Sequence, residues 1–187
     1  MRSPSRRWLP TRIAWMATCA LGSAAFAIPE AAAFERQWHL GLDGGYALGA
    51  FPEANVSGFD VGLHGTYGLT DAFNLRLHSD VSAFDLPAPR TSALLVNAGL
   101  GAEYVIDILR WVPYLGATAG PNVMLVQNSG TVVHLGVEVL GGLGYQLSRN
   151  WSVGGEARYR LLLLGEPTVS PTHGFVGVAR VAYAWGS

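Results

Sequence analysis

Residues 132–147, VVHLGVEVLGGLGYQL, alternate between apolar side chains and polar or small ones. Every odd-numbered position from Val133 to Leu147 holds an apolar residue or glycine, whereas the even-numbered positions include His134, Glu138 and Gln146. A period of two places successive side chains on opposite faces of a β-strand. The alternation resumes after Ser148-Arg149-Asn150. The stretch therefore predicts a long β-hairpin that ends near Leu163.

The pattern alone leaves open which face points inward, since soluble sandwiches and lipocalins bury their apolar face. Strands of this kind recur along the chain, exceed the usual five or six residues and carry aromatic residues at their ends. Such strands are typical of a membrane β-barrel with an apolar exterior and a polar interior. The composition agrees, because 50% of the residues are hydrophobic and only 13% are charged, against about a quarter in soluble domains. No mature segment approaches the roughly 20 apolar residues of a membrane-spanning helix.

The first 27 residues have the features of a signal peptide. Four arginines precede an apolar run over residues 13–26, and Ala25-Phe26-Ala27 fits a cleavage site. Ala31-Ala32-Ala33 is a second possible site, and we favour the first. We predict a signal peptide at 1–27, a short lead-in at 28–37 and a barrel at 38–187.

Cleavage at Ala27 removes Cys19, the only cysteine, so neither a disulfide nor a thiolate metal site is expected. The net charge of the full chain is −1, and the loss of four arginines makes it more negative. A nucleic-acid-binding role is not expected from this charge.

Eight antiparallel strands account for the remaining chain. Their predicted ranges are 38–48, 58–67, 73–81, 93–106, 112–120, 132–147, 151–163 and 173–185. In the fifth strand either parity fits, although Leu115, Ala117 and Ala119 favour odd positions facing outward. Residues 123–126 are a possible extension of that strand. The fold class is an all-β, up-and-down transmembrane barrel with a polar interior.

The connections alternate in length, with short turns after the second, fourth and sixth strands. Longer connections are predicted at 49–57, 82–92, 121–130 and 165–172. Outer-membrane barrels have short periplasmic turns and longer outer loops. Aromatic residues gather at the short-turn end and predict a girdle at one membrane interface. They are Trp38, Tyr67, Phe73, Tyr104, Trp111, Tyr145, Trp151, Tyr183 and Trp185.

Several turn and strand-end segments resemble those of small eight-stranded outer-membrane barrels of the OmpA/OmpX kind. They include Tyr67-Gly68-Leu69-Thr70-Asp71, Val112-Pro113-Tyr114-Leu115-Gly116, Leu147-Ser148-Arg149-Asn150-Trp151 and the aromatic-ended last strand. The resemblance implies a Gram-negative outer-membrane location and recognition of the last strand by the barrel-assembly machinery. The chain departs from the pattern by placing Gly186-Ser187 after Trp185. A peptidoglycan-tethering role is not implied.

Charged residues of inward parity are the nearest approach to a site. They are Asp43, Arg76, Glu103, Glu138, Glu156, Arg158, Arg160 and Arg180. Counted from the short-turn end, Arg76 and Glu103 lie at similar heights on neighbouring strands and are predicted to pair. Arg180 is predicted to bridge Asp43 and Glu156 where the first and last strands meet. We interpret the network as a packed polar plug, the alternative being a gate or selectivity filter in a narrow pore.

The inward-facing histidines, His39, His64, His78 and His134, are interpreted as hydrogen-bonding fillers rather than as metal ligands, because they lie at different heights. Ser79 lies between His78 and Asp80, but neighbouring residues of a strand point to opposite faces, which argues against a catalytic triad. We predict no catalytic residue, no cofactor and no metal.

The predicted function is that of a non-enzymatic outer-membrane barrel with a structural or surface-interaction role through its outer loops. Its expected partners are outer-membrane lipids, the assembly machinery and an unknown surface partner. The alternatives are a narrow channel, a carrier of small apolar ligands and, less favoured, a lipid-A-modifying enzyme.

Overall fold

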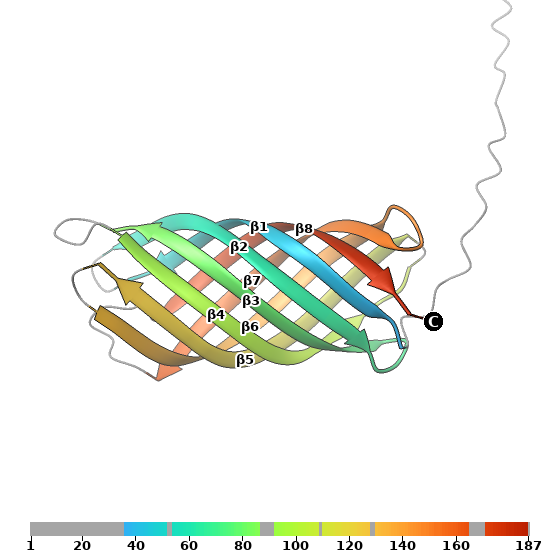
Figure 1. Ribbon diagram of the computed structural model, residues 1–187, viewed down its shortest axis with the longest axis horizontal. Coiled ribbons are helices and arrows are strands. Elements are labelled where there is room, and N and C mark those ends of the chain that lie inside the picture. Colours follow the sequence, from blue (N-terminus) through green and yellow to red (C-terminus); the bar gives the residue numbers. More distant parts are fainter. Residues whose placement is uncertain are drawn as a thin grey trace, which may run out of the picture.

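The computed structural model describes residues 36–51, 54–86, 92–108, 110–127, 130–164 and 171–186. These residues form a closed barrel of eight antiparallel strands in sequence order, with β1 paired to β8 (Figure 1). The predicted fold class is therefore confirmed. The strands are β1 (Trp38–Ala50), β2 (Asn55–Gly68), β3 (Phe73–Asp85), β4 (Ser92–Val105), β5 (Trp111–Val126), β6 (Gly130–Gln146), β7 (Trp151–Leu164) and β8 (His173–Trp185).

The predicted signal peptide and all but the last two residues of the predicted lead-in lie outside the described residues. Within the described ranges, no helix is long and apolar enough to cross a membrane.

Side chains alternate between the outer surface and the lumen along the strands. On β1, for example, Leu42 is 58% exposed on the outer surface, whereas Asp43 is 5% exposed in the lumen. The parity predicted for β5 is also correct, because Leu115 is exposed outside and Thr118 is buried inside. The outer surface is thus built from large apolar side chains that water would solvate poorly.

The two ends of the barrel differ. The chain enters at Trp38 and leaves at Trp185, which are opposite one another in the β1–β8 register, and we call this the termini end. The other end is called the loop end. Trp38 and Leu48 lie ten residues apart on the outer face of β1. At roughly 3.3 Å per residue and a tilt of about 40°, they are about 25 Å apart along the barrel axis, the height of the apolar band of membrane barrels.

Several strands extend further toward the loop end than predicted. β1 continues to Ala50 and β2 begins at Asn55, so the connection predicted at 49–57 is only 51–54. β3 continues to Asp85 and β4 begins at Ser92, which shortens the connection predicted at 82–92 to 86–91.

β5 continues to Val126, so the possible extension at 123–126 belongs to the strand, and the loop predicted at 121–130 is reduced to 127–129. Gly120 and Pro121 resemble loop signals, but pairing with β6 runs through both residues. On the β4 side the pairing is interrupted at these two residues, where proline has no N–H to donate. The predicted alternation of connection lengths is therefore wrong for the connections after β1 and β5.

A polar interior was predicted, but the lumen is not polar along its whole length. At the loop end it is filled by an apolar layer, formed by Ala47, Val56, Phe84, Ala93, Leu95, Met124, Val126, Val176 and Val178. Met124 has no exposed surface. These residues have inward parity at the loop ends of their strands, where the narrow interior brings them into contact. The polar residues are confined to the rest of the lumen.

Candidate functional site

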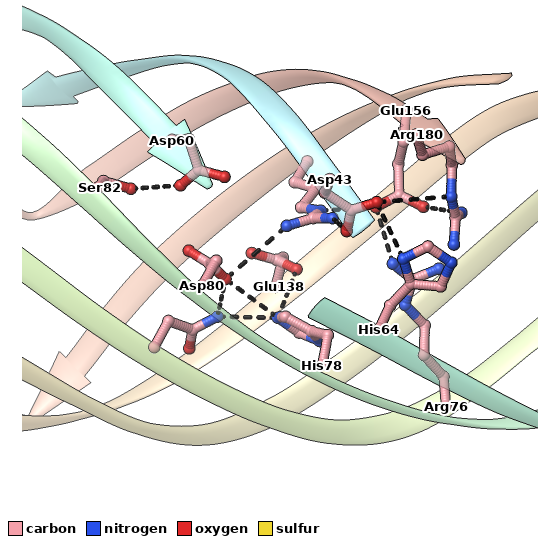
Figure 2. A network of polar contacts seen from close by, with 12 residues as sticks. Asp43, Asp60, His64, Arg76, His78, Asp80, Ser82, Glu138, Glu156 and Arg180 are labelled. Carbon is pink, nitrogen blue, oxygen red and sulfur yellow. Dashed lines mark hydrogen bonds and ion pairs between the residues drawn. The ribbon is translucent and has the colours of Figure 1, made fainter. Parts of the chain in front are cut away.

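Arg180 of β8 lies between two carboxylates at the closure of the barrel. Its Nη1 donates to Glu156 Oε2 at 2.6 Å, and its Nε lies 3.7 Å from Asp43 Oδ1 (Figure 2). Arg180 also donates a hydrogen bond to the hydroxyl of Tyr114 and lies over its ring, 5.0 Å from the centroid. Strands β1, β5, β7 and β8 are thus tied together inside the lumen.

Arg76 of β3 reaches two further carboxylates. Its Nη1 donates to Glu103 Oε2 of neighbouring β4 at 2.9 Å, and its Nη2 donates to Glu156 Oε1 of β7 at 2.8 Å. Since β3 and β7 are not neighbours in the barrel, the second bond crosses the lumen. Both contacts are guanidinium–carboxylate hydrogen bonds of normal length, which is the arrangement that compensates for burial.

Arg158, like Arg76, is completely enclosed. Its side chain has no exposed surface, and it donates to Glu156 Oε1 from Nε at 2.5 Å and to Asp43 from Nη2. Its Nη1 lies 3.7 Å from Asp80 Oδ2. Arg158 therefore connects the contacts of Arg180 and Arg76 to a second group of residues.

That second group is centred on Arg160 and Asp80. Arg160 Nη2 donates to Asp80 Oδ1 at 2.9 Å and to Glu138 Oε2 at 2.8 Å. His78 Nε2 lies 3.2 Å from Glu138 Oε1, and Asn97 Nδ2 donates to Asp80 Oδ2 at 2.9 Å. Figure 2 shows His78, Asp80 and Glu138 of this group beside the contacts of Asp43, Glu156 and Arg180. We call the two together the lumen network, formed by Asp43, His64, Arg76, His78, Asp80, Asn97, Glu103, Glu138, Glu156, Arg158, Arg160 and Arg180.

Glycines make room for the larger members of the lumen. A Cβ added to Gly41 would overlap the imidazole ring of His64, whose Nδ1 lies 2.9 Å from Asp43 Oδ1. A Cβ added to Gly142 would overlap the phenol of Tyr114. The small residues on the lumen face thus position the ring side chains that contact the network.

A cavity remains between the network and the termini end. It comprises about 770 Å³, including the part open to solvent. Its polar lining includes Asn74, Glu103 and Arg180, and Val105 and Val112 form part of an apolar wall. We call it the termini-end cavity.

The sequence-predicted interior residues all face the lumen. The structure brings Arg180 to Glu156 and Asp43, and Arg76 to Glu103, as the sequence had suggested. It also brings Arg158 and Arg160 into the same network, together with Glu138. Sequence reasoning left out Asp80, Asn97 and Tyr114 as network contacts. Their inward parity could be read from the sequence, whereas contacts between strands on opposite sides of the barrel could not.

The four inward histidines differ in their surroundings. His64 and His78 contact network carboxylates, His39 lines the termini-end cavity and His134 is buried on β6. Within the described ranges, no group of three or more His, Cys, Asp or Glu side chains is arranged to hold a metal ion.

Ser79 does not join its neighbours in a catalytic arrangement. Its hydroxyl donates to the backbone oxygen of Asn97 at 3.0 Å. Its side chain lies on the outer face, whereas His78 and Asp80 are buried in the lumen.

The nine aromatic residues of the predicted girdle surround the termini end. They form cross-strand pairs, with ring centroids 4.6 Å apart for Trp38–Tyr67, 5.1 Å for Phe73–Tyr104, 4.8 Å for Trp111–Tyr145 and 5.1 Å for Trp151–Tyr183. Trp185 stacks on Tyr183 at 6.2 Å. Such pairs stabilise neighbouring strands beyond the area that they bury.

Solved structures with this fold include Neisserial surface protein A, which has a TM-score of 0.69 and 20% identity over 78% of this chain and 96% of that one. The outer membrane protein OprG of Pseudomonas aeruginosa has a TM-score of 0.53 and 14% identity, with 82% and 98% covered. Ail of Yersinia pestis, in complex with the heparin analogue sucrose octasulfate, has a TM-score of 0.52 and 12% identity, with 81% and 99% covered.

These structures are small outer-membrane barrels, so the predicted resemblance to this kind of barrel is confirmed at the level of the fold. No protein-family model and no curated protein matches the chain.

Proposed function

We propose that the protein is an integral β-barrel of a Gram-negative outer membrane, without enzymatic activity, that has a structural role or acts through its loop end at the cell surface. The observation that carries this proposal is the filled lumen. Arg158 and Arg76 have no exposed surface within the lumen network, and Met124 has none within the apolar layer. An ion crossing the barrel would have to displace side chains of the lumen network and of the apolar layer.

The lipid-facing surface supports the membrane location. The aromatic girdle of the termini end and the apolar residues between Trp38 and Leu48 match the height and chemistry of a bilayer core and its interface. The partners that we propose are outer-membrane lipids around the barrel and the barrel-assembly machinery at β8. At the loop end we propose a surface partner whose identity the chain does not specify.

A channel and a lipid-modifying enzyme are the competing functions. The channel would need a continuous aqueous path, which neither the lumen network nor the apolar layer provides. The enzyme would need a nucleophile with a base in contact, and Ser79 is instead bonded to the backbone of Asn97. The filled lumen argues against a channel and the contact of Ser79 argues against an enzyme, so we favour the structural or surface role.

The absence of enzymatic activity is tested by mass spectrometry of lipid A and phospholipids from cells that produce the protein and from cells that lack it. We expect the protein in the outer-membrane fraction, in a heat-modifiable folded form, and identical lipid masses in both cell types. Gain or loss of an acyl chain that disappears in Ser79→Ala would overturn the non-enzymatic assignment. A parallel variant, Ser152→Ala, controls for general effects of removing a hydroxyl.

A further inference from the structure

The polar part of the lumen holds more carboxylates than guanidinium groups. Among the described residues, six inward carboxylates stand against four inward guanidinium groups. The carboxylates belong to Asp43, Asp60, Asp80, Glu103, Glu138 and Glu156, and the guanidinium groups to Arg76, Arg158, Arg160 and Arg180. The carboxyl groups thus outnumber the guanidinium groups by two. Because the apolar layer closes the loop end, the low-dielectric walls focus the field of the ionised carboxylates nearest the termini end, such as Glu103, toward the termini-end cavity.

Asn74 supplies an unused acceptor at this cavity. It is 3% exposed and lines the cavity. Its Nδ2 donates to Glu103 Oε1 at 3.0 Å, and because a carboxylate accepts hydrogen bonds only, this contact fixes the orientation of the amide. The remaining atom, Oδ1, is buried and has no hydrogen-bond partner among the described residues. An unpaired buried acceptor is unfavourable, and a donor that reached Oδ1 through a small shift of the cavity lining would satisfy it.

Two other acceptors line the same cavity. The carboxylate of Glu103 and the hydroxyl of Thr66 join Asn74 on its polar side. A primary ammonium group has three N–H donors and no acceptor, which suits three acceptors of this kind. The wall formed by Val105, Val112 and Ala182 is apolar and would contact a short alkyl chain.

The two arginines that line the cavity do not reverse this preference. Arg180 is held by Glu156 and Tyr114, which already use its Nη1. Arg149 is exposed in the turn between β6 and β7, where solvent ions screen its charge.

We propose that the termini-end cavity binds a small, water-soluble primary alkylammonium ion, with the ammonium group at Asn74 and Glu103 and the alkyl chain along the Val105–Val112 wall. The cavity lies at the opposite end of the lumen from the apolar layer, so this inference does not rest on the proposed role of the loop end.

The purified, folded barrel in detergent tests the proposal with three ligands of one size: n-butylammonium, n-butanol and n-butyrate. Trp151 lines the cavity and provides a fluorescence signal, and calorimetry provides an independent one. We expect saturable binding of n-butylammonium, with n-butanol and n-butyrate bound at least about tenfold more weakly. Equal affinity for the three ligands, or no saturable binding of n-butylammonium, would overturn the proposal.

Two asparagine variants locate the binding. Asn74→Ala removes the free acceptor and should weaken n-butylammonium binding about tenfold or more. Asn122 is also buried, faces the lumen from β5 and has an unpaired Oδ1, but it does not line the cavity. Asn122→Ala should therefore leave binding unchanged. Equal effects of the two substitutions would contradict the assignment, and the ligand series on the unchanged barrel remains decisive if either variant fails to fold.

Discussion

Asp43 of β1 and Arg180 of β8 are directly opposite one another where the first and last strands close the barrel, with Nε and Oδ1 3.7 Å apart. The same Asp43 also accepts a hydrogen bond from Arg158 of β7. The closure of the sheet is therefore supported inside the lumen as well as by backbone pairing. Because Asp43 contacts two arginines, the loss of either one should lower the stability of the barrel by a different amount.

Arg158→Met should lower the free energy of unfolding by about 3 to 5 kcal/mol, the usual cost of removing one partner from a buried ion pair. Arg180→Met should cost less, because Asp43 keeps Arg158 and Glu156 keeps Arg76 and Arg158. Urea unfolding in lipid vesicles, followed by tryptophan fluorescence, measures both. Arg149→Met, in the exposed turn, is the control. Equal stability of the Arg158 and Arg149 variants would contradict the claim that the lumen network stabilises the barrel.

Gly41→Ala should destabilise the barrel by about 1 to 3 kcal/mol, because the added Cβ would overlap His64 and the backbone oxygen of Val181. Gly44→Ala, on the outer face of the same strand, meets no atom within 4 Å and should change stability by less than about 0.5 kcal/mol. Heat modifiability on gels and urea unfolding compare the two. Unchanged stability of the Gly41→Ala variant would show that the His64 ring has another position available.

Val139→Arg should hinder insertion into vesicles, because an arginine on the lipid face near mid-membrane costs about 2 to 4 kcal/mol. Val139 is exposed on the outer face of β6, six residues from Tyr145 of the girdle. Leu147→Arg places an arginine in the exposed turn after β6 and should cost at most about 1 kcal/mol. The yield of folded barrel after dilution from urea into vesicles measures the difference. Equal yields would argue that the exposed apolar face does not contact lipid.

Single cysteines should reveal the orientation on intact cells. Asn55→Cys and Thr172→Cys lie at the loop end and should react with a membrane-impermeant maleimide. Asp71→Cys and Arg149→Cys lie in turns at the termini end and should react only after lysis. The opposite pattern would place the termini outside the cell and would invert the proposed surface role.

Parity along the strands was sufficient to predict most of the fold. Eight strands, their inward and outward faces and the girdle positions follow from a period of two, because a one-residue error would exchange the two faces throughout a strand. Strand ends were predicted less well, since Pro121 was predicted as the start of a loop and yet continues β5. Local composition does not reveal pairing partners on neighbouring strands.

The lumen network was predictable only between neighbours. Arg76 with Glu103, and Arg180 with Asp43, follow from counting residues along adjacent strands. The contacts of Arg76 with Glu156 and of Arg160 with Asp80 join β3 to β7, and their existence depends on the diameter and the stagger of the closed barrel. The apolar layer was missed for a related reason. Phe84 and Met124 lay in predicted connections, and such inward residues come into contact only when the strands close into a barrel.

Single-channel recording in planar bilayers tests the central claim, a lumen closed by the ion-pair network and the apolar layer. Folded wild-type barrel, inserted at a density confirmed by its heat-modifiable band, should produce no unitary current steps at either polarity. Met124→Gly combined with Phe84→Gly would open the apolar layer alone and should still not conduct, because Arg158 and Arg160 continue to fill the polar lumen. Reproducible unitary steps from the wild-type barrel would contradict the account and would identify the protein as a channel.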